Sequence, residues 1–319
     1  MQQHVGSYYA ASRNIHTEYP VLQGSVDSDV CIIGAGYTGL STALFLLEHG
    51  FSVTVLEAAR VGFGASGRNG GQIVNSYSRD IDTIERQLPP KQAQLLGEMA
   101  FEGGRIIRER IARYGIQCDL KDGGVFAALT GKQLGHLEAQ KKLWESYGHT
   151  QLQLLDRAGI GKVVGTDRYL CGLLDMSGGH IHLLNLALGE AAAVASLGGK
   201  IYEQSAATRI DRGANPVVHT ANGQVKARFV VVAGNAYLGG LVPELAAKSM
   251  PCGTQVLTTE PLSEDLARSL LPQDYCVEDC NYLLDYFRLS ADRRLIYGGG
   301  VVYGARDPAD IEAIIRPKM

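Results

Sequence analysis

The sequence predicts an α/β fold in which a β-α-β unit begins a first, discontinuous domain and a mostly antiparallel α+β domain is inserted into it. Two observations predict the first domain: a buried-strand pattern at Val30–Ile33 and a glycine-rich turn directly after it. A third observation concerns the segment from Pro251 onward, where the pattern predicts only strands, at Thr254–Thr259, Tyr282–Leu289 and Leu295–Val302. Because one hydrophobic core stops growing near about 250–300 residues, we expect two domains in this chain of 319 residues.

The turn after the first strand has the spacing G-x-G-x-x-G, and each glycine has its own steric reason. Gly34 permits a tight turn, Gly36 lets a pyrophosphate approach the backbone, and Gly39 lets the next helix pack closely on the strand. We expect that helix from Tyr37 to about His49, with its N-terminal amides and positive dipole end at the phosphates. The turn therefore predicts a dinucleotide site.

An acidic residue and a second glycine-rich loop follow this helix. Phe51–Leu56 is the next predicted strand, and Glu57 at its end suits a carboxylate that accepts hydrogen bonds from a ribose diol. The loop Gly62–Gly71 offers many backbone amides and one permanent cation, Arg68, which suits an anionic cofactor. Because the loop comes directly after the ribose-binding strand, we predict FAD. Glu57 alone does not distinguish FAD from NAD, so an NAD-linked dehydrogenase is the alternative.

The remaining chain predicts further helices, one hairpin and several domain crossings. Helices are expected at Lys91–Tyr114, Lys132–Tyr147 and Leu184–Leu197, and Asn222-Gly223 predicts a β-hairpin with a type I′ turn. Pro89-Pro90 breaks the chain after the first unit. The expected boundaries are 1–88 and 177–243 for the first domain, and 89–176 and 244–319 for the second.

Composition argues against several other classes of protein. The net charge is −3, so nothing indicates nucleic acid or an anionic membrane as a partner. No apolar run reaches the roughly 18 residues of a membrane-spanning helix. Met1–Arg13 lacks the apolar core of a secretory leader, so the six cysteines are expected as reduced thiols in the cytoplasm. The sequence does not indicate an oligomeric state.

Two pairs of potential metal ligands occur, and neither predicts a metal site. Cys276 and Cys280 are not joined by a second pair with zinc spacing. His180 and His182 alternate in a glycine-rich turn, where packing is the favoured role. The single tryptophan, Trp144, is expected to be a packing residue and not to stack on a flavin.

At this point the chain resembles the D-amino-acid-oxidase and glycine-oxidase superfamily of FAD-dependent amine oxidoreductases. Within it, the chain is most similar to the γ-glutamylputrescine oxidoreductases of bacterial putrescine breakdown. The match covers essentially the whole chain. It rests on the segments Ser7–Ser12, Gly62–Gln72, Asn75–Asp82, Ser177–His182, Val232–Gly239, Pro251–Val256 and Val277–Tyr286.

The resemblance implies roles for individual residues around FAD. The amides of Tyr37 and Thr38 would donate to the pyrophosphate, and Glu57 with Ala58 beside it would hold the adenosine ribose. Ala207 would meet the adenine through its backbone. The implied cofactor-binding set is Gly34, Gly36, Tyr37, Thr38, Gly39, Glu57, Ala58, Ala65, Ser66, Arg68, Gly70, Gly71, Gln72 and Ala207.

The resemblance also implies the reaction. A neutral amine would give hydride to the flavin, and the imine would hydrolyse to an aldehyde and ammonia while dioxygen becomes peroxide. For the nearest relatives the amine is γ-glutamylputrescine and the product γ-glutamyl-γ-aminobutyraldehyde. No catalytic base is implied. Tyr282, Tyr286 and Arg288 alternate, so they are candidate substrate contacts if their strand face looks at the flavin, and otherwise ordinary cross-strand residues.

The sequence leaves two alternatives to this function open. An oxidase of another amine, such as glycine, sarcosine or a D-amino acid, would share every motif. The chain also ends at Met319, where relatives continue with a strand and a glycine-rich segment that completes the FAD domain. We therefore expect the closing FAD segment to be missing, and an inactive truncated flavoprotein is the second alternative.

Overall fold

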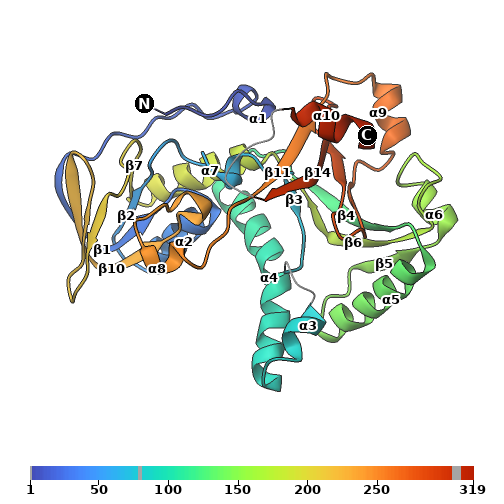
Figure 1. Ribbon diagram of the computed structural model, residues 1–319, viewed down its shortest axis with the longest axis horizontal. Helices are drawn as coiled ribbons and strands as arrows, with labels where there is room; N and C mark the ends of the chain where they lie inside the picture. Colours follow the sequence, from blue (N-terminus) through green and yellow to red (C-terminus); the bar gives the residue numbers. More distant parts are fainter. Residues whose placement is uncertain (1, 78–80, 304–309) are drawn as a thin grey trace. The chain divides into compact units, whose positions relative to one another are not determined.

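The structure is a computed structural model and describes residues 2–77, 81–303 and 310–319 (Figure 1). The chain forms two compact units and crosses between them several times. The chain passes from one unit to the other after residues 69, 110, 118, 182 and 252. The sequence predicted changes after residues 88, 176 and 243, and those domain boundaries stay a prediction. The first unit comprises Met1–Asn69, Ile111–Cys118 and Leu183–Cys252, and the second comprises Gly70–Arg110, Asp119–His182 and Gly253–Met319.

A six-stranded sheet with the order β7-β2-β1-β10-β9-β8 forms the centre of the first unit. The pairs β1·β10, β1·β2 and β2·β7 are parallel, and β9 pairs antiparallel with β10 and β8. Helices α2 (Tyr37–Glu48) and α7 (Leu183–Ser196) belong to the same unit (Figure 1). The strands are β1 (Gly24–Ile33), β2 (Val53–Leu56), β7 (Lys200–Tyr202), β8 (Arg209–Asp211), β9 (Val217–His219) and β10 (Gly223–Val232). The short helical pieces are α1 (Tyr8–Ala11), η1 (Ala65–Gly67), η2 (Asn235–Tyr237) and α8 (Pro243–Ala246).

The predicted β-α-β unit is present. Strand β1 is longer than the apolar run Val30–Ile33 because its first half, although exposed or only partly buried, also pairs with β10. Helix α2 buries Gly39, Leu40, Ala43 and Leu44 on one face, which is the spacing of an amphipathic helix. Gly50 follows its end with a φ of +83°, a backbone conformation that favours glycine.

The hairpin at Asn222-Gly223 forms, but its turn is of another kind. Strands β9 and β10 pair antiparallel, and the backbone amide of Thr220 donates to the carbonyl of Gly223 at 2.8 Å. The loop residues are therefore Ala221 and Asn222, and neither has the positive φ that a type I′ turn requires. The prediction of a type I′ turn was wrong because the side chain of Thr220 accepts the Gly223 amide at 3.1 Å and closes the turn differently.

The second unit is built on an eight-stranded sheet with the order β11-β14-β13-β12-β4-β6-β3, and β5 pairs with β6 off this path. Its described pairings are antiparallel except for β12 with β4, which confirms the mostly antiparallel character. The strands are β3 (Gln72–Ile73), β4 (Lys121–Ala128), β5 (Leu152–Leu155), β6 (Cys171–His180), β11 (Cys252–Thr258), β12 (Cys276–Asp279), β13 (Tyr286–Leu289) and β14 (Leu295–Tyr303). The helical pieces are α3 (Ile81–Glu85), α4 (Pro90–Tyr114, of which residues 111–114 belong to the first unit), α5 (Gly131–Ser146), α6 (Arg157–Gly161), α9 (Glu264–Leu270), α10 (Ile311–Ile315) and η3 (Arg316–Lys318).

The two faces of this second sheet differ. One face packs into a hydrophobic cluster that includes Val125, Leu174, Val277 and Leu289. On the other face, helix α5 covers one end with Leu137 and its neighbours. Because side chains alternate along a strand, the residues that flank Val125 and Val277 project toward this second face. This second face carries the polar residues described below.

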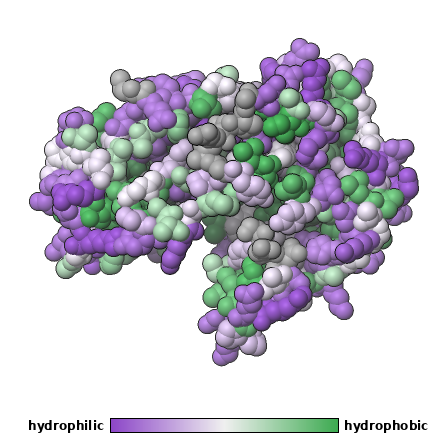
Figure 2. All heavy atoms as spheres, viewed as in Figure 1, coloured by the Kyte–Doolittle hydropathy of each residue, from purple (hydrophilic) through white to green (hydrophobic). Residues whose placement is uncertain are grey.

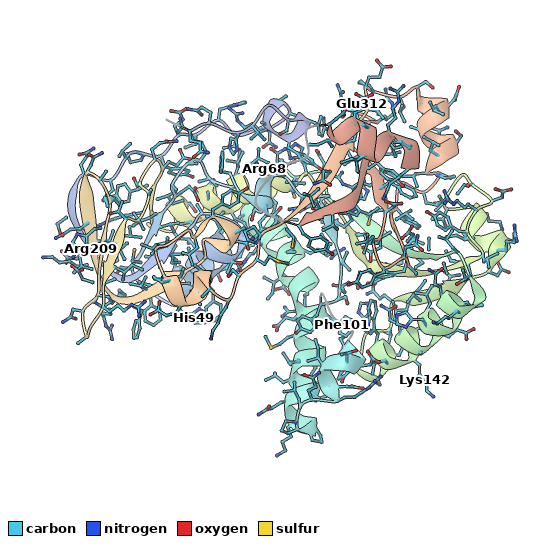
Figure 3. All side chains as sticks on the ribbon, in the orientation of Figure 1. His49, Arg68, Phe101, Lys142, Arg209 and Glu312 are labelled. Atoms are coloured by element: carbon cyan, nitrogen blue, oxygen red, sulfur yellow. The ribbon has the colours of Figure 1, made fainter. Side chains whose placement is uncertain are left out.

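Trp144 packs against aromatic neighbours, as the sequence predicted. Its ring lies edge-on to Phe101 and Phe126, at centroid distances of 5.5 and 5.6 Å. Phe101, which projects from α4 (Figure 3), also stacks on His149 at 4.2 Å. These contacts join α4, α5 and β4 within the second unit.

The prediction of strands alone after Pro251 was wrong. Ser263 caps helix α9 by accepting a hydrogen bond from the Leu266 amide, and Asp310 caps α10 in the same way. The predicted strand at Tyr282–Leu289 begins only at Tyr286. The carboxylate of Asp279 accepts hydrogen bonds from the amides of Asn281 and Asp285, which turns the intervening segment out of the sheet.

The surface of the described chain is mixed in polarity. Figure 2 shows hydrophilic residues over most of the visible face, with hydrophobic residues scattered between them. Among the described helices, none combines the length and the apolar character needed to cross a membrane.

Candidate functional site

The glycine-rich turn of the first unit has the geometry that its spacing predicted. Gly34 has a φ of +109°, and a Cβ atom there would lie 2.6 Å from the carbonyl oxygen of Ala233. A Cβ atom at Gly39 would lie 1.9 Å from the oxygen of Gly34. Both distances are far below van der Waals contact, so the turn accepts only glycine at these positions.

Ser66 brings the second glycine-rich loop to this turn. Its hydroxyl accepts a hydrogen bond from the Tyr37 amide at 3.0 Å. A Cβ atom at Gly36 would lie 2.8 Å from the same hydroxyl oxygen. The first turn of α2, where Tyr37 and Thr38 begin the helix, therefore has a hydroxyl at its positive end, in the position expected for a phosphate oxygen.

Glu57 stands at the end of β2, beside the turn. Its carboxylate accepts hydrogen bonds from the amides of Ala35 and Ala59, at 2.8 and 2.9 Å. Burial raises the pKa of Glu57, while these amide hydrogen bonds act in the opposite direction. Glu57 thus fixes the turn and also presents a carboxyl group to the adjoining cavity.

A cavity joins most of the predicted cofactor residues of the first unit. It is lined by Gly34, Gly36, Glu57, Ala58, Ala65, Ser66 and Ala207. Ala207 lies in the connection before β8 and not in a strand. The parallel pairing of β10 with β1 also brings residues of the segment Val232–Gly239 to this cavity; they are Ala233, Gly234, Asn235 and Tyr237.

Arg68 contacts a residue that lines this cavity but lies outside the lining itself. Its guanidinium donates hydrogen bonds to the carbonyl of Phe63 and to the hydroxyl of Tyr237, both at 2.9 Å. It also lies 4.8 Å from the centroid of the Phe63 ring (Figure 3 labels Arg68). In the described contacts, Arg68 holds a cavity-lining tyrosine and does not itself line the cavity.

The end of the same loop, Gly70–Gln72, belongs to the second unit. The Arg288 side chain, which is only 3% exposed, donates from Nε to the Gly70 carbonyl at 2.6 Å. A Cβ atom at Gly70 would lie 2.4 Å from the Tyr286 ring, and one at Gly71 would lie 2.6 Å from the Arg288 guanidinium. The structure therefore brings two of the three substrate-contact candidates against predicted cofactor residues.

Tyr282 is not part of this group. Its side chain is 92% exposed, and it lies in the segment that Asp279 turns out of the sheet. The predicted alternation of three residues along one strand therefore holds for Tyr286 and Arg288 alone.

The two histidines of Ser177–His182 are buried near the same loop. His180 pairs in register with Gln72, and its Nε2 atom lies 2.9 Å from the Asp274 carbonyl oxygen. Burial, together with the nearby charge of Arg288, lowers the pKa of His180 to about 4. Burial also lowers the pKa of His182. Both rings are neutral at pH 7, so they do not add positive charge to the site.

The polar face of the second sheet carries further acids that sequence reasoning missed. Asp175 on β6 lies 3.0 Å from His149 Nε2 and accepts a hydrogen bond from Asn75 at 2.9 Å. Burial alone would raise the pKa of Asp175, but the hydrogen bonds from His149, Asn75 and Ser177 outweigh it and lower the pKa. The sequence signal was an acid inside an otherwise apolar strand, which is rare without a partner.

Glu278 on β12 is the second such acid. Burial, and secondarily the charge of Asp279, raises the pKa of Glu278 to about 7. Its neighbour Val277 projects into the hydrophobic cluster, so Glu278 projects to the opposite, polar face. Of the segment Asn75–Asp82 that carries the resemblance, residues 78–80 lie outside the described residues.

Comparison with known proteins agrees with this architecture. The family model of FAD dependent oxidoreductases matches residues 29–318. The chain is 63% identical to "Gamma-glutamylputrescine oxidoreductase" of Escherichia coli (strain K12), over 100% of this chain and 75% of that protein. It is 41% identical to "Probable oxidoreductase OrdL" of Haemophilus influenzae, over 100% of this chain and 74% of that protein.

Solved structures share the fold at lower identity. Glycine oxidase from Geobacillus kaustophilus superposes with a TM-score of 0.68 at 21% identity, covering 89% of this chain and 75% of the other. L-proline dehydrogenase from P. horikoshii has a TM-score of 0.73 at 16% identity, covering 92% and 75%. At these identities the likeness shows the fold alone.

Proposed function

Because this chain belongs to the FAD-dependent oxidoreductase family, whose model matches residues 29–318, we propose that it oxidises the primary amine of γ-glutamylputrescine. The products would be γ-glutamyl-γ-aminobutyraldehyde, ammonia and hydrogen peroxide, and the reaction would serve putrescine catabolism. The observation that carries this proposal is the 63% identity, over the whole chain, to a protein named for that substrate.

FAD is the cofactor of this family, and the residues of the first unit fit its nucleotide end. The turn at Gly34, Gly36 and Gly39 has no space for side chains, which leaves backbone amides to face a pyrophosphate. We propose that Tyr37 and Thr38 donate to the pyrophosphate once the ligand displaces the Ser66 hydroxyl. Glu57 and Ala207 line the same cavity, which suits the ribose and the adenine.

The residues of the second unit fit the flavin end. Because Gly70 and Gly71 lack side chains, the Tyr286 ring and the Arg288 guanidinium lie directly against their backbone. Bound FAD supplies the electron chemistry, accepting hydride from the carbon beside the amine and passing electrons to dioxygen. The protein's share is to hold the loop: Arg288 donates to the Gly70 carbonyl, and Tyr286 packs against Gly70. Substrate contact by Tyr286 and Arg288 stays a proposal.

We also propose that the protein works in the cytoplasm with a small-molecule amine and dioxygen as its partners. All six cysteines, each within the described residues, are free thiols, which suits a reducing compartment. The formal charge of −3 gives no reason to expect nucleic acid.

The test is the visible spectrum of the purified chain before and after anaerobic addition of γ-glutamylputrescine. We expect a flavin spectrum that bleaches, followed by peroxide formation when air is admitted. Bleaching by glycine, sarcosine or a D-amino acid, but not by γ-glutamylputrescine, would show an oxidase of another amine. A chain that holds no flavin under any condition would support the inactive-fragment alternative.

A further inference from the structure

The polar face of the second sheet contains an acid that the proposed reaction has not yet used. Glu278 on β12 stands in register with Tyr286 on β13 and with Phe126 on β4. Tyr286 in turn packs against Gly70, at the end of the loop proposed to face the flavin. Glu278 is therefore one strand away from a residue that contacts this loop.

Glu278 also lines a small cavity on this face. The segment Gln72–Asn75 forms one wall, and β4, β6 and β12 form the other, with Asp175 and Glu278 among the lining side chains. At its centre the cavity has room for about one water-sized group. A primary ammonium group is of that size.

Two polar groups of this cavity wall have no partner within the described residues. Glu278 has neither a hydrogen bond nor an ion pair there. The Nε2 atom of Gln72, a hydrogen-bond donor, is buried and without an acceptor; the lone pair of a neutral amine would supply one, but an ammonium group would not. Glu278 is half-buried, and removing an ionised carboxylate from most of its water without a cation beside it is costly, so a cationic ligand would be favoured at this position.

We propose that Glu278 receives the ammonium group of the amine substrate in this cavity and accepts its proton. In this step one N–H bond of the R-CH2-NH3⁺ group breaks and one O–H bond forms at the Glu278 carboxylate. The products are R-CH2-NH2 and a neutral carboxyl group, so charge and atoms balance. This inference rests on the proposed function, because the neutral amine is the form that can give up hydride.

Among the acidic groups of this cavity wall, Glu278 is the one that can exchange a proton near neutral pH, because the others stay either protonated or ionised. Burial raises the pKa of both Cys276 and Cys280 to about 12, so neither thiol ionises near pH 7. Asp175, held by His149, has a lowered pKa and stays charged. Within the described residues, the titratable and charged groups that face Glu278 are Cys276, Cys280 and Asp279 from its own strand and its continuation, Asp175 from β6, and Tyr286 and Arg288 from β13.

The experiment compares Glu278→Gln and Glu278→Asp with the unmodified holoenzyme. The matched control is Glu264→Gln, an exposed acid of the same unit whose partner is Arg268. Losing a charge-assisted hydrogen bond should raise KM for γ-glutamylputrescine about 10- to 100-fold in Glu278→Gln, with Glu278→Asp intermediate and the control unchanged.

The pH profile separates this role from a structural one. In the unmodified enzyme kcat/KM should rise with pH near 7 as Glu278 ionises, and Glu278→Gln should lose this limb. A limb near pH 7 that persists in Glu278→Gln, with an unchanged KM, would overturn the proposal.

A second measurement uses the unmodified holoenzyme, in case the Gln variant does not fold. γ-Glutamylpentylamide, with an unbranched pentyl chain, has a methyl group where the substrate has its ammonium group. Its inhibition constant should not vary between pH 6 and 8, while the substrate's KM falls over that range. Equal pH dependence of the two ligands would contradict the role of Glu278.

A failure of the proposed substrate can be told apart from a failure of the proposed role of Glu278. If the unmodified enzyme bleaches with another primary amine only, the substrate proposal fails and the same comparison is made with that amine. If no amine bleaches it, the proposed function and the inference both fail.

Discussion

The two units build their sites in different ways. In the first unit the site is made of backbone: glycines at Gly34, Gly36 and Gly39 leave amides and carbonyls at the surface of a tight turn. In the second unit the proposed site is made of side chains, Glu278, Tyr286 and Arg288, which the pairing of β12 with β13 places on one sheet face. A backbone site is specified within a few residues, whereas a side-chain site depends on strands far apart in the sequence.

The two kinds of site should also respond differently to mutation. A substitution in the backbone site inserts atoms where no space exists, so its effect is steric and large. A substitution in the side-chain site removes a contact or a charge, so its effect is graded and depends on pH. The following predictions test this difference, from the largest expected effect to the smallest.

Gly39→Ala should have the largest effect. Its Cβ would lie 1.9 Å from the Gly34 oxygen, so strand β1 and helix α2 would have to separate. We expect a loss of about 3 kcal/mol or more in the free energy of unfolding, and protein purified without flavin. Thermal unfolding and the ratio of visible to ultraviolet absorbance measure both effects.

Gly135→Ala in α5 is the control for this prediction. A Cβ at Gly135 meets no atom within 4 Å, and the residue lies in a helix of the second unit. Alanine should stabilise by about 0.5–1 kcal/mol through helix propensity, with unchanged flavin content. Equal behaviour of the two variants would contradict the steric account of the turn.

Arg288→Met should have the next largest effect. It keeps much of the side-chain volume but removes the donor to the Gly70 carbonyl, leaving that group unpaired at a cost of about 1–3 kcal/mol. Flavin affinity, measured by titrating the apoprotein with FAD, should fall about 10- to 100-fold. Arg268→Met, which alters an arginine side chain that is 69% exposed, should leave flavin affinity unchanged.

The same contrast explains how much of the molecule could be predicted from its sequence. The strand, turn and helix from Val30 to Glu48 were predictable because each depends on near neighbours. Tyr282 was misplaced because the carboxylate of Asp279 turns the chain, and that hydrogen bonding has no periodic signal. Glu278 was missed because its significance depends on the pairing of β12 with β4 and β13, which no local pattern encodes.

Tyr286→Phe, compared with Tyr282→Phe, should give a smaller effect. The Tyr286 ring packs where side chains at Gly70 and Gly298 would otherwise lie, and phenylalanine keeps that packing. Loss of the hydroxyl alone should raise KM for the amine about tenfold if it contacts substrate. Tyr282, at 92% exposure, should tolerate the same change without effect on kcat or KM. Equal results for the two tyrosines would remove Tyr286 from the list of substrate contacts.

The smallest effect is expected on stability, in Glu278→Gln without substrate. Because the pKa of Glu278 is raised from 4.5 to about 7 on folding, ionisation costs stability as pH rises between these values. After a discount for partial exposure, the glutamine variant should gain about 1–2 kcal/mol at pH 8 and little at pH 4.5. In a chain of this size the midpoint of thermal unfolding should rise by about 1–3 °C at pH 8. Calorimetry at both pH values measures this difference, and Glu264→Gln should show none. A variant less stable at pH 8 than the unmodified protein would mean that the Glu278 carboxylate is already satisfied in the folded chain.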